Sequence, residues 1–238
     1  MNDKQWSSAT PGLLIILLDQ SGSMMENYEG TTRTKFATLA VNKVIDNIIS
    51  KNADGTAPKN RCFISVIGYN HNVKELCSGW LKDLDAKPLR YETVKKKMHD
   101  GAGGIIEREV NTPVWVESAE QQISIDIIDR AIHFAKELSL KWSEDNCMSP
   151  IVIDCSKVCH TEYAKEIIGQ LKAITTMDGN VLFFGCYSKK ENGSEIFSKM
   201  PEEWEYKFQR RDLKKEDYIN GLLNYEHIGP IFCAIMEV

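Results

Sequence analysis

The sequence predicts an α/β fold: a three-layer, doubly wound sandwich around a mostly parallel sheet, with one antiparallel edge strand. Residues 13–18 are six consecutive apolar residues, which indicate a strand covered on both faces. Further apolar runs alternate along the chain with segments whose apolar residues recur at helical spacing. With 238 residues, 42% of them hydrophobic, the chain is long enough to bury a core.

The elements follow from local patterns. Apolar residues at four-residue spacing predict a helix at 31–50, which turn residues at 52–55 end. The short connection at 70–72 predicts a hairpin, and therefore the antiparallel edge strand. The full order is a strand at 13–18, a helix at 31–50, strands at 61–70 and 73–80, a short helix at 89–99, extended pieces at 105–110 and 113–116, a helix at 123–142, a strand at 150–154, a helix at 161–176 and a strand at 181–186.

No linker or repeat divides the chain, so we expect a single domain over 1–238, with its core at about 10–190. Residues 191–238 are expected to form a helical extension that packs on this core. Within it, the apolar segment 228–238 fits either an edge strand or a docked helix.

Composition excludes several classes of protein. A net charge of -5 argues against nucleic acid as the main partner, and we interpret the lysines at 95–97 as a solvated helix face. The N-terminus does not resemble a signal peptide, and no apolar run is long enough to span a membrane. Seven cysteines, an odd number, suit free thiols in a reducing compartment, so we expect a cytoplasmic protein.

Three oxygen-bearing residues, Asp19, Ser21 and Ser23, follow the first apolar run directly. Ligand sites on parallel sheets lie just beyond the carboxyl ends of the strands, which is where this loop falls. Gly22 lets the backbone bend between the two serines. Carboxylate and hydroxyl oxygens, without sulfur or imidazole, suit a hard cation such as Mg²⁺.

Asp19-Gln20-Ser21-Gly22-Ser23 after a buried strand resembles the metal-ion-dependent adhesion motif of von Willebrand factor A (vWA) domains. Residues 61–70 resemble the second strand of that family, and residues 178–184 resemble a later strand of its bacterial members. The resemblance covers roughly residues 10–190, and it is closest to small cytoplasmic bacterial members.

The resemblance implies five oxygen ligands from three loops, of which only the first loop is complete here. At the second loop Gln122 stands in the position of a threonine, with Ser124 as a substitute hydroxyl and Thr112 as the second choice. At the third loop Ser156 keeps a hydroxyl, but Lys157 stands where the family has an acid. Because an ammonium there would repel a divalent ion, we expect a degenerate site that binds Mg²⁺ weakly or not at all.

We therefore expect a non-enzymatic module that docks another protein by its strand-end rim. The rim residues expected to contact the partner, beside the first loop, are Tyr69, Asn70, Lys157 and His160. The resemblance implies a bacterial stress-response or defence system with a kinase or phosphatase as partner. From the net charge and the short apolar runs we expect neither nucleic acid nor a membrane as partner. Two alternatives stay open: a metal-dependent α/β hydrolase or phosphatase, with Asp154 as the only other candidate acid, and a structural subunit with a vestigial site.

Overall fold

The computed structural model describes residues 6–28, 30–55, 57–99, 104–119, 127–156, 162–191 and 194–197. Its elements, in order, are β1 (Gly12–Asp19), the 3₁₀ turn η1 (Gly22–Met25), β2 (Asn27–Tyr28), β3 (Thr31–Thr32), α1 (Arg33–Asn52), β4 (Cys62–Tyr69), β5 (Val73–Trp80), α2 (Leu81–Ala86), β6 (Arg90–His99), β7 (Ile105–Val114), α3 (Ile128–Asp145), β8 (Ile151–Ser156), α4 (Glu162–Lys172), β9 (Leu182–Glu191) and β10 (Ser194–Phe197). No helix in these ranges is long and apolar enough to cross a membrane.

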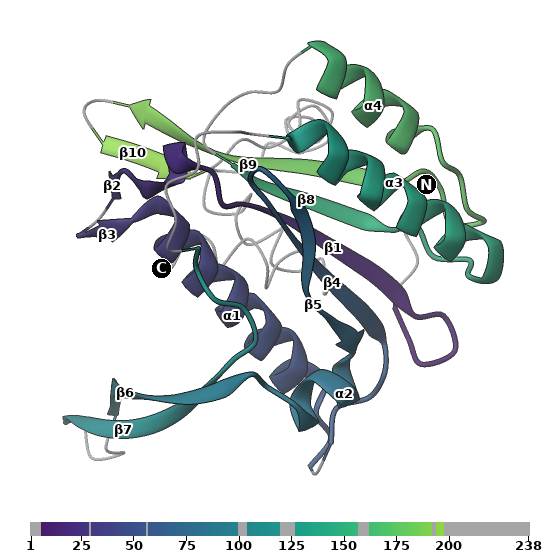
Figure 1. The fold of residues 1–238 in the computed structure, drawn as a ribbon. Coiled ribbons are helices and arrows are strands. Elements are labelled where there is room, and N and C mark those ends of the chain that lie inside the picture. The colour runs from purple at the N-terminus through teal and green to yellow at the C-terminus, as the bar shows by residue number, and fades with distance from the viewer. Residues whose placement is uncertain are drawn as a thin grey trace, which may run out of the picture.

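Six strands form the main sheet, in the order β10-β9-β8-β1-β4-β5 (Figure 1). The four strands from β9 to β4 are parallel, and β5 pairs antiparallel with β4 as the sequence predicts. The predicted α/β fold with its mostly parallel sheet is therefore confirmed. At the opposite edge β10 is also antiparallel, and its residues 194–197 correct part of the predicted C-terminal helical region. Residues 198–238, including the apolar segment 228–238, lie outside the described residues.

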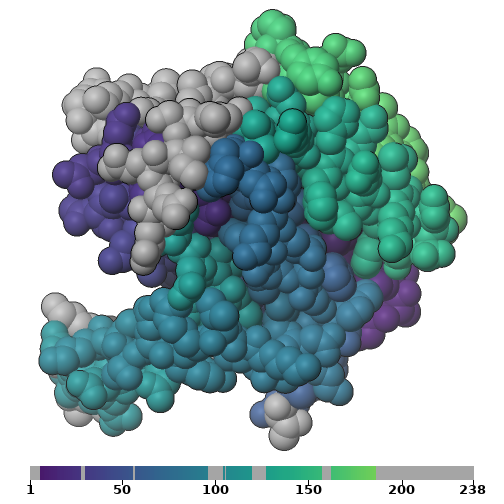
Figure 2. All heavy atoms as spheres, viewed as in Figure 1, coloured from purple at the N-terminus to yellow at the C-terminus, as the bar shows by residue number. Residues whose placement is uncertain are grey.

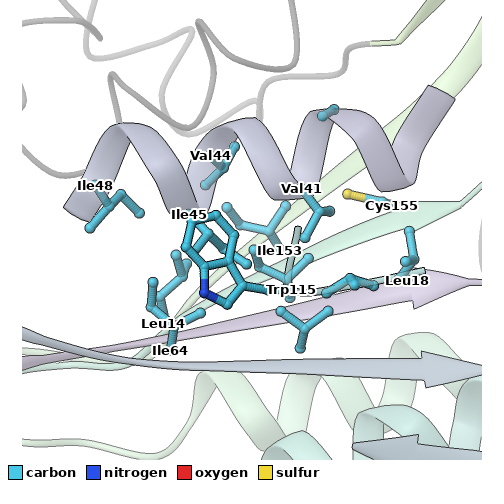
Figure 3. Close-up of a cluster of buried hydrophobic side chains, with 14 of the residues drawn as sticks. Leu14, Leu18, Val41, Val44, Ile45, Ile48, Ile64, Trp115, Ile153 and Cys155 are labelled. Atoms are coloured by element: carbon cyan, nitrogen blue, oxygen red, sulfur yellow. The ribbon is translucent and has the colours of Figure 1, made fainter. Parts of the chain in front are cut away.

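Helices cover both faces of this sheet, with α1 on one side and α3 and α4 on the other (Figure 1). All eight residues of β1 are buried between its neighbours β8 and β4. Its even-numbered residues, among them Leu14 and Leu18, pack against α1 together with Trp115 (Figure 3). Its odd-numbered residues pack toward α3 and α4. Each of these side chains contributes about 1.5–3 kcal/mol by leaving water, so both layers fix the position of β1.

Two predicted helices have different bounds in the structure. The helix predicted at 123–142 begins at Ile128, since Ile127 has the non-helical dihedrals of an N-cap; residues 123–126 lie outside the described residues. The helix predicted at 161–176 ends at Lys172. There the chain turns back, and the Thr176 N–H donates to the Gly179 carbonyl at 2.8 Å, with Gly179 at a φ of 150°.

The short helix predicted at 89–99 is wrong: residues 90–99 form β6, which pairs with β7 in a separate two-stranded ribbon (Figure 1). The buried side chain of Asn42 in α1 fixes the base of this ribbon. Its Oδ1 accepts from the N–H groups of Trp115 at 2.7 Å and Val116 at 3.0 Å, and its Nδ2 donates to the Val116 carbonyl at 2.8 Å. The amide thus bonds the segment after β7 as a neighbouring strand would.

Candidate functional site at the strand ends

Three polar side chains meet on one face of the sheet where β1, β4 and β8 end. Asp19 is the register partner of Tyr69, and Asp154 is the partner of Leu17, two residues before Asp19. Since successive strand residues alternate between faces, Asp19, Tyr69 and Asp154 all project to the side that α3 and α4 cover. The topology therefore brings together residues that lie far apart in the sequence.

The loop after β1 holds Asp19, Ser21 and Ser23 close together, as the sequence predicts for three donors on one tight loop. Asp19 Oδ1 accepts from the Ser21 N–H at 2.8 Å, and the two serine hydroxyls lie 2.9 Å apart. The Ser21 carbonyl accepts from the Met24 N–H at 3.0 Å, which starts the 3₁₀ turn. The carboxylate thus fixes the bend that carries both hydroxyls.

This loop is less open than the predicted docking rim. Asp19 is 0% exposed and Ser21 is 2% exposed, while Ser23 is half-buried. Asn70 is also half-buried, and its Oδ1 accepts from the Asn72 N–H at 3.0 Å in the turn to β5. Among the described residues of the first loop and the predicted rim, Ser23 and Asn70 are therefore half-buried, whereas Asp19 and Ser21 are buried.

Tyr69 was predicted to contact the partner, but the structure corrects this prediction, because Tyr69 is fully buried. Its side chain extends across β1 rather than toward solvent, and its hydroxyl donates to Asp154 Oδ1 at 2.9 Å. The Ser156 hydroxyl donates to the other oxygen of the same carboxyl, Oδ2, at 2.8 Å. A buried carboxyl is costly unless such donors satisfy it, so both bonds stabilise Asp154 in the interior.

The sequence analysis missed this Tyr69–Asp154–Ser156 cluster, although a signal for it exists. Asp154 is an acid inside an otherwise apolar strand, at a position that shares a face with the buried Val152. An acid on a face that a helix covers requires donors from neighbouring strands. The register of β4 and β8 with β1, which the sequence does not specify, supplies Tyr69.

The described residues do not add any of the other predicted ligands or rim residues to the first loop. Gln122, Ser124, Lys157 and His160 lie outside them. Ser156 bonds Asp154, and Thr112 lies within β7 opposite Glu92 rather than at the start of a helix. Among the described residues there is no group of three or more His, Cys, Asp or Glu side chains that could hold a metal ion.

Two cysteines lie on or beside the central strands, and neither is poised as a nucleophile. Burial raises the pKa of the Cys62 thiol, which is fully enclosed in β4. In β5, burial and then the nearby Glu75 carboxylate raise the pKa of Cys77 to about 11. Because the thiolate is the reactive form, these raised pKa values disfavour a nucleophilic role for either thiol at neutral pH.

Comparison with known proteins gave structural likenesses only. No family model matches the chain, and no curated protein matches it. Among solved structures, the vWF domain of the type V pili tip protein Mfa5 from Porphyromonas gingivalis is 15% identical over 63% of this chain and 38% of that chain, with a TM-score of 0.34. The ArnB paralog VWA2 from Sulfolobus acidocaldarius is 13% identical over 76% of this chain and 36% of that chain, with a TM-score of 0.39. The pilus adhesin RrgA from Streptococcus pneumoniae is 14% identical over 85% of this chain and 32% of that chain, with a TM-score of 0.35.

Proposed function

We propose that this chain is a non-enzymatic, vWA-like protein-interaction module that docks a partner protein at the strand-end face around Ser23 and Asn70. The loop after β1 carries the proposal. An acid and two serines leave the central strand of a parallel sheet at its carboxyl end, where such sheets bind ligands. Asp19 fixes the loop from within, and half-buried Ser23 presents it to a partner.

The geometry of the two serines supports a vestige of a cation site. Mg²⁺ binds oxygens at 2.0–2.1 Å in an octahedron, so adjacent ligands lie about 2.9 Å apart. The hydroxyls of Ser21 and Ser23 lie 2.9 Å apart in a hydrogen bond, so they could become adjacent ligands without moving apart. With Asp19 they would hold one side of the ion, and the bound ion would offer a site for a carboxylate of the partner.

Three donors from one loop supply only half of the six ligands that Mg²⁺ takes. We therefore propose a degenerate site with weak or no metal binding, consistent with a lysine at position 157 in place of the family's acid. Lys157 itself lies outside the described residues.

The hydrogen bonds at the strand ends support a non-enzymatic role. The hydroxyls of Ser21 and Ser23 bond each other, and Asp154 accepts from Tyr69 and Ser156. A serine nucleophile needs an adjacent base instead. In the ranges that the structure describes, no histidine bonds either serine of the loop.

The resemblance of the first loop to bacterial vWA domains extends the proposal to a cytoplasmic setting. By that analogy, the partner belongs to a bacterial stress-response or defence system, and it is a kinase or a phosphatase. This setting rests on the sequence motif at 19–23.

Site-specific photo-crosslinking tests the docking face. A photoreactive phenylalanine analogue replaces His71, which is exposed in the turn after β4 at the strand-end face. The matched control carries it at Met177, which is 80% exposed and precedes β9 at the opposite end of the sheet. In cells that encode the protein, we expect one protein to crosslink from position 71 and not from position 177.

Equal crosslinking from both positions, or from position 177 alone, would contradict the docking face. A parallel assay with p-nitrophenyl phosphate and Mg²⁺ tests the enzymatic alternative. If the unmodified chain hydrolyses this substrate and Asp19→Asn abolishes the hydrolysis, the phosphatase alternative is correct and the non-enzymatic proposal is wrong.

A further inference from the structure

A groove lies between helix α1 and the β6–β7 ribbon, beside the proposed docking face. Figure 2 shows the ribbon standing away from the body of the molecule. The groove has a volume of about 680 Å³, within the range of about 300–1,000 Å³ that is usual for ligand sites. Described residues of α1, of the ribbon and of the segment after β7 line it.

The two long walls of the groove follow from the periodicity of their elements. On α1 the lining residues are three or four positions apart, so they lie on one face of the helix. These residues are Lys35, Thr38, Leu39 and Asn42. On β6 the lining residues are 90, 92 and 94, which alternate along the strand and therefore share the face of the ribbon that is turned toward α1.

Several polar groups of these walls are already bonded within the chain. The Thr38 hydroxyl donates to a carbonyl of its own helix at 2.7 Å, and the Asn42 amide bonds the segment after β7. The guanidinium of Arg90 pairs with the carboxylates of both Glu92 and Glu117. These three charges therefore form a self-paired rim and do not require a charged ligand.

Between these bonded groups the groove presents apolar side chains. Leu39 is 45% exposed on α1, although it is apolar. Val94 and Pro113 on the ribbon are half-buried, and Val116 is buried beneath them. Apolar side chains within a polar rim are the usual anatomy of a surface that binds another protein.

The groove is continuous with the strand-end loop. Asn70, a residue of the proposed docking face, also lines the groove. From the loop itself, the Gln20 side chain donates to the carbonyl of Glu117 at 3.3 Å. Gly68 makes room for this contact, since a Cβ at that position would lie 2.7 Å from Gln20 Oε1. A protein that docks at the strand ends therefore meets one end of the groove.

We propose that this groove receives an extended apolar segment of the partner protein that docks at the strand ends. The inference rests on the proposed function, because it assigns the groove to the same partner. A three-turn helix about 10 Å wide and 16 Å long fills roughly 1,300 Å³, about twice the volume of the groove, which favours an extended segment. The bonds from Asn42 hold the ribbon base in place before the segment binds, so little ordering is needed at that wall.

Fluorescence polarisation tests the groove with the full chain and a fluorescein-labelled octapeptide, Ser-Val-Leu-Val-Leu-Val-Ser-Lys. We expect saturable binding with a Kd below about 1 mM, and none for the same peptide with glutamine at every apolar position. Leu39→Glu places a charge in the groove and should weaken binding about five- to fiftyfold. Leu140→Glu is the matched control, because Leu140 is 44% exposed on α3 at the other face of the sheet, and it should leave binding within about twofold.

A second variant probes the opposite wall. Val94→Thr keeps a β-branched side chain in β6 but adds a hydroxyl, and it should weaken binding about threefold. Circular dichroism checks that each variant is folded. Equal effects of Leu39→Glu and Leu140→Glu, equal binding of the glutamine peptide, or no saturable binding up to about 1 mM would each overturn the proposal.

Photo-crosslinking in cells identifies the occupant. With the photoreactive phenylalanine analogue at position 39, we expect the protein that crosslinks from position 71, and we expect no crosslink to it from position 140. A crosslink from position 71 without one from position 39 would overturn the groove and leave the docking face standing. Crosslinks from neither position, with peptide binding intact, would overturn the docking face and the assignment of the groove to its partner. A crosslink from position 39 to residues 198–238 of the chain, or to a second copy, would assign the groove to that occupant and overturn the proposal as well.

Discussion

The hydrogen bond from Tyr69 to Asp154 makes a quantitative prediction about the interior of the site. Both residues are 0% exposed, and the donor and acceptor oxygens lie 2.9 Å apart. Removing the donor leaves a buried acceptor unsatisfied, which costs about 1–3 kcal/mol. We therefore expect Tyr69→Phe to lower the free energy of unfolding by about 2 kcal/mol. For a chain of this length that corresponds to a fall in Tm of about 4–8 °C.

Urea unfolding followed by circular dichroism measures this loss. Tyr91→Phe is the matched control, because Tyr91 is 61% exposed in β6 and its hydroxyl removal should change stability by less than about 0.5 kcal/mol. A double-mutant cycle with Asp154→Asn should give a coupling energy above about 1 kcal/mol, since the two residues share one bond. If Tyr69→Phe costs no more than Tyr91→Phe, or if the cycle is additive, the reasoning about the buried cluster is refuted.

Three other predictions concern the clamp, a thiol and the metal. Asn42→Ala leaves the buried N–H groups at 115–116 without their acceptor; we expect a loss of about 2–4 kcal/mol and faster amide exchange there, and unchanged exchange would contradict the clamp. Cys77, with a pKa of about 11, should react slowly with iodoacetamide at pH 8. Glu75→Gln removes a negative charge that raises this pKa, so the reaction should become faster. An unchanged rate would show that burial alone raises the pKa. Lys157→Asp should create stabilisation by Mg²⁺, measured as a rise in Tm with Mg²⁺ concentration, and equal stabilisation of the unmodified chain would remove the inhibitory role of Lys157.

The centre of the main sheet was predictable because strands such as β1 and β8 are buried on both faces. An apolar run such as residues 13–18 has no helical periodicity and ends in turn residues, so it admits few interpretations. Helix α1 was predictable for a related reason, since its buried side chains recur at helical spacing on one face. Burial imposes these patterns on the sequence, and they can be recovered from it.

The β6–β7 ribbon was not predictable in the same way. Both of its strands carry exposed polar side chains, such as Lys95 and Glu109, on a ribbon that stands away from the core. The period-two alternation that marks a half-buried strand is therefore missing, and the lysines at 95–97 suggested a helix face instead. The predicted bounds of α3 and α4 were inaccurate for a more local reason, because caps and turns such as Thr176–Gly179 depend on backbone geometry that periodicity does not encode.

The candidate site was predictable in its chemistry and only partly in its accessibility. Asp19, Ser21 and Ser23 come from one continuous stretch, so the sequence alone places them on a single loop. The role of Tyr69 depends instead on two register relations, of β1 with β4 and of β1 with β8. Contacts that depend on the register between strands distant in sequence cannot be inferred from the residue pattern of any single segment.

The base of the ribbon has a consequence for how this chain can change over evolution. Asn42 holds the segment after β7, and the Leu89 N–H before β6 donates to the Val114 carbonyl at 2.8 Å. Entry and exit of the insertion are therefore adjacent and anchored, and the sheet does not depend on what lies between them. Changes in the ribbon beyond its buried end at Val114 are therefore expected to leave the sheet and the strand-end loop intact, so this projection can diversify independently of them.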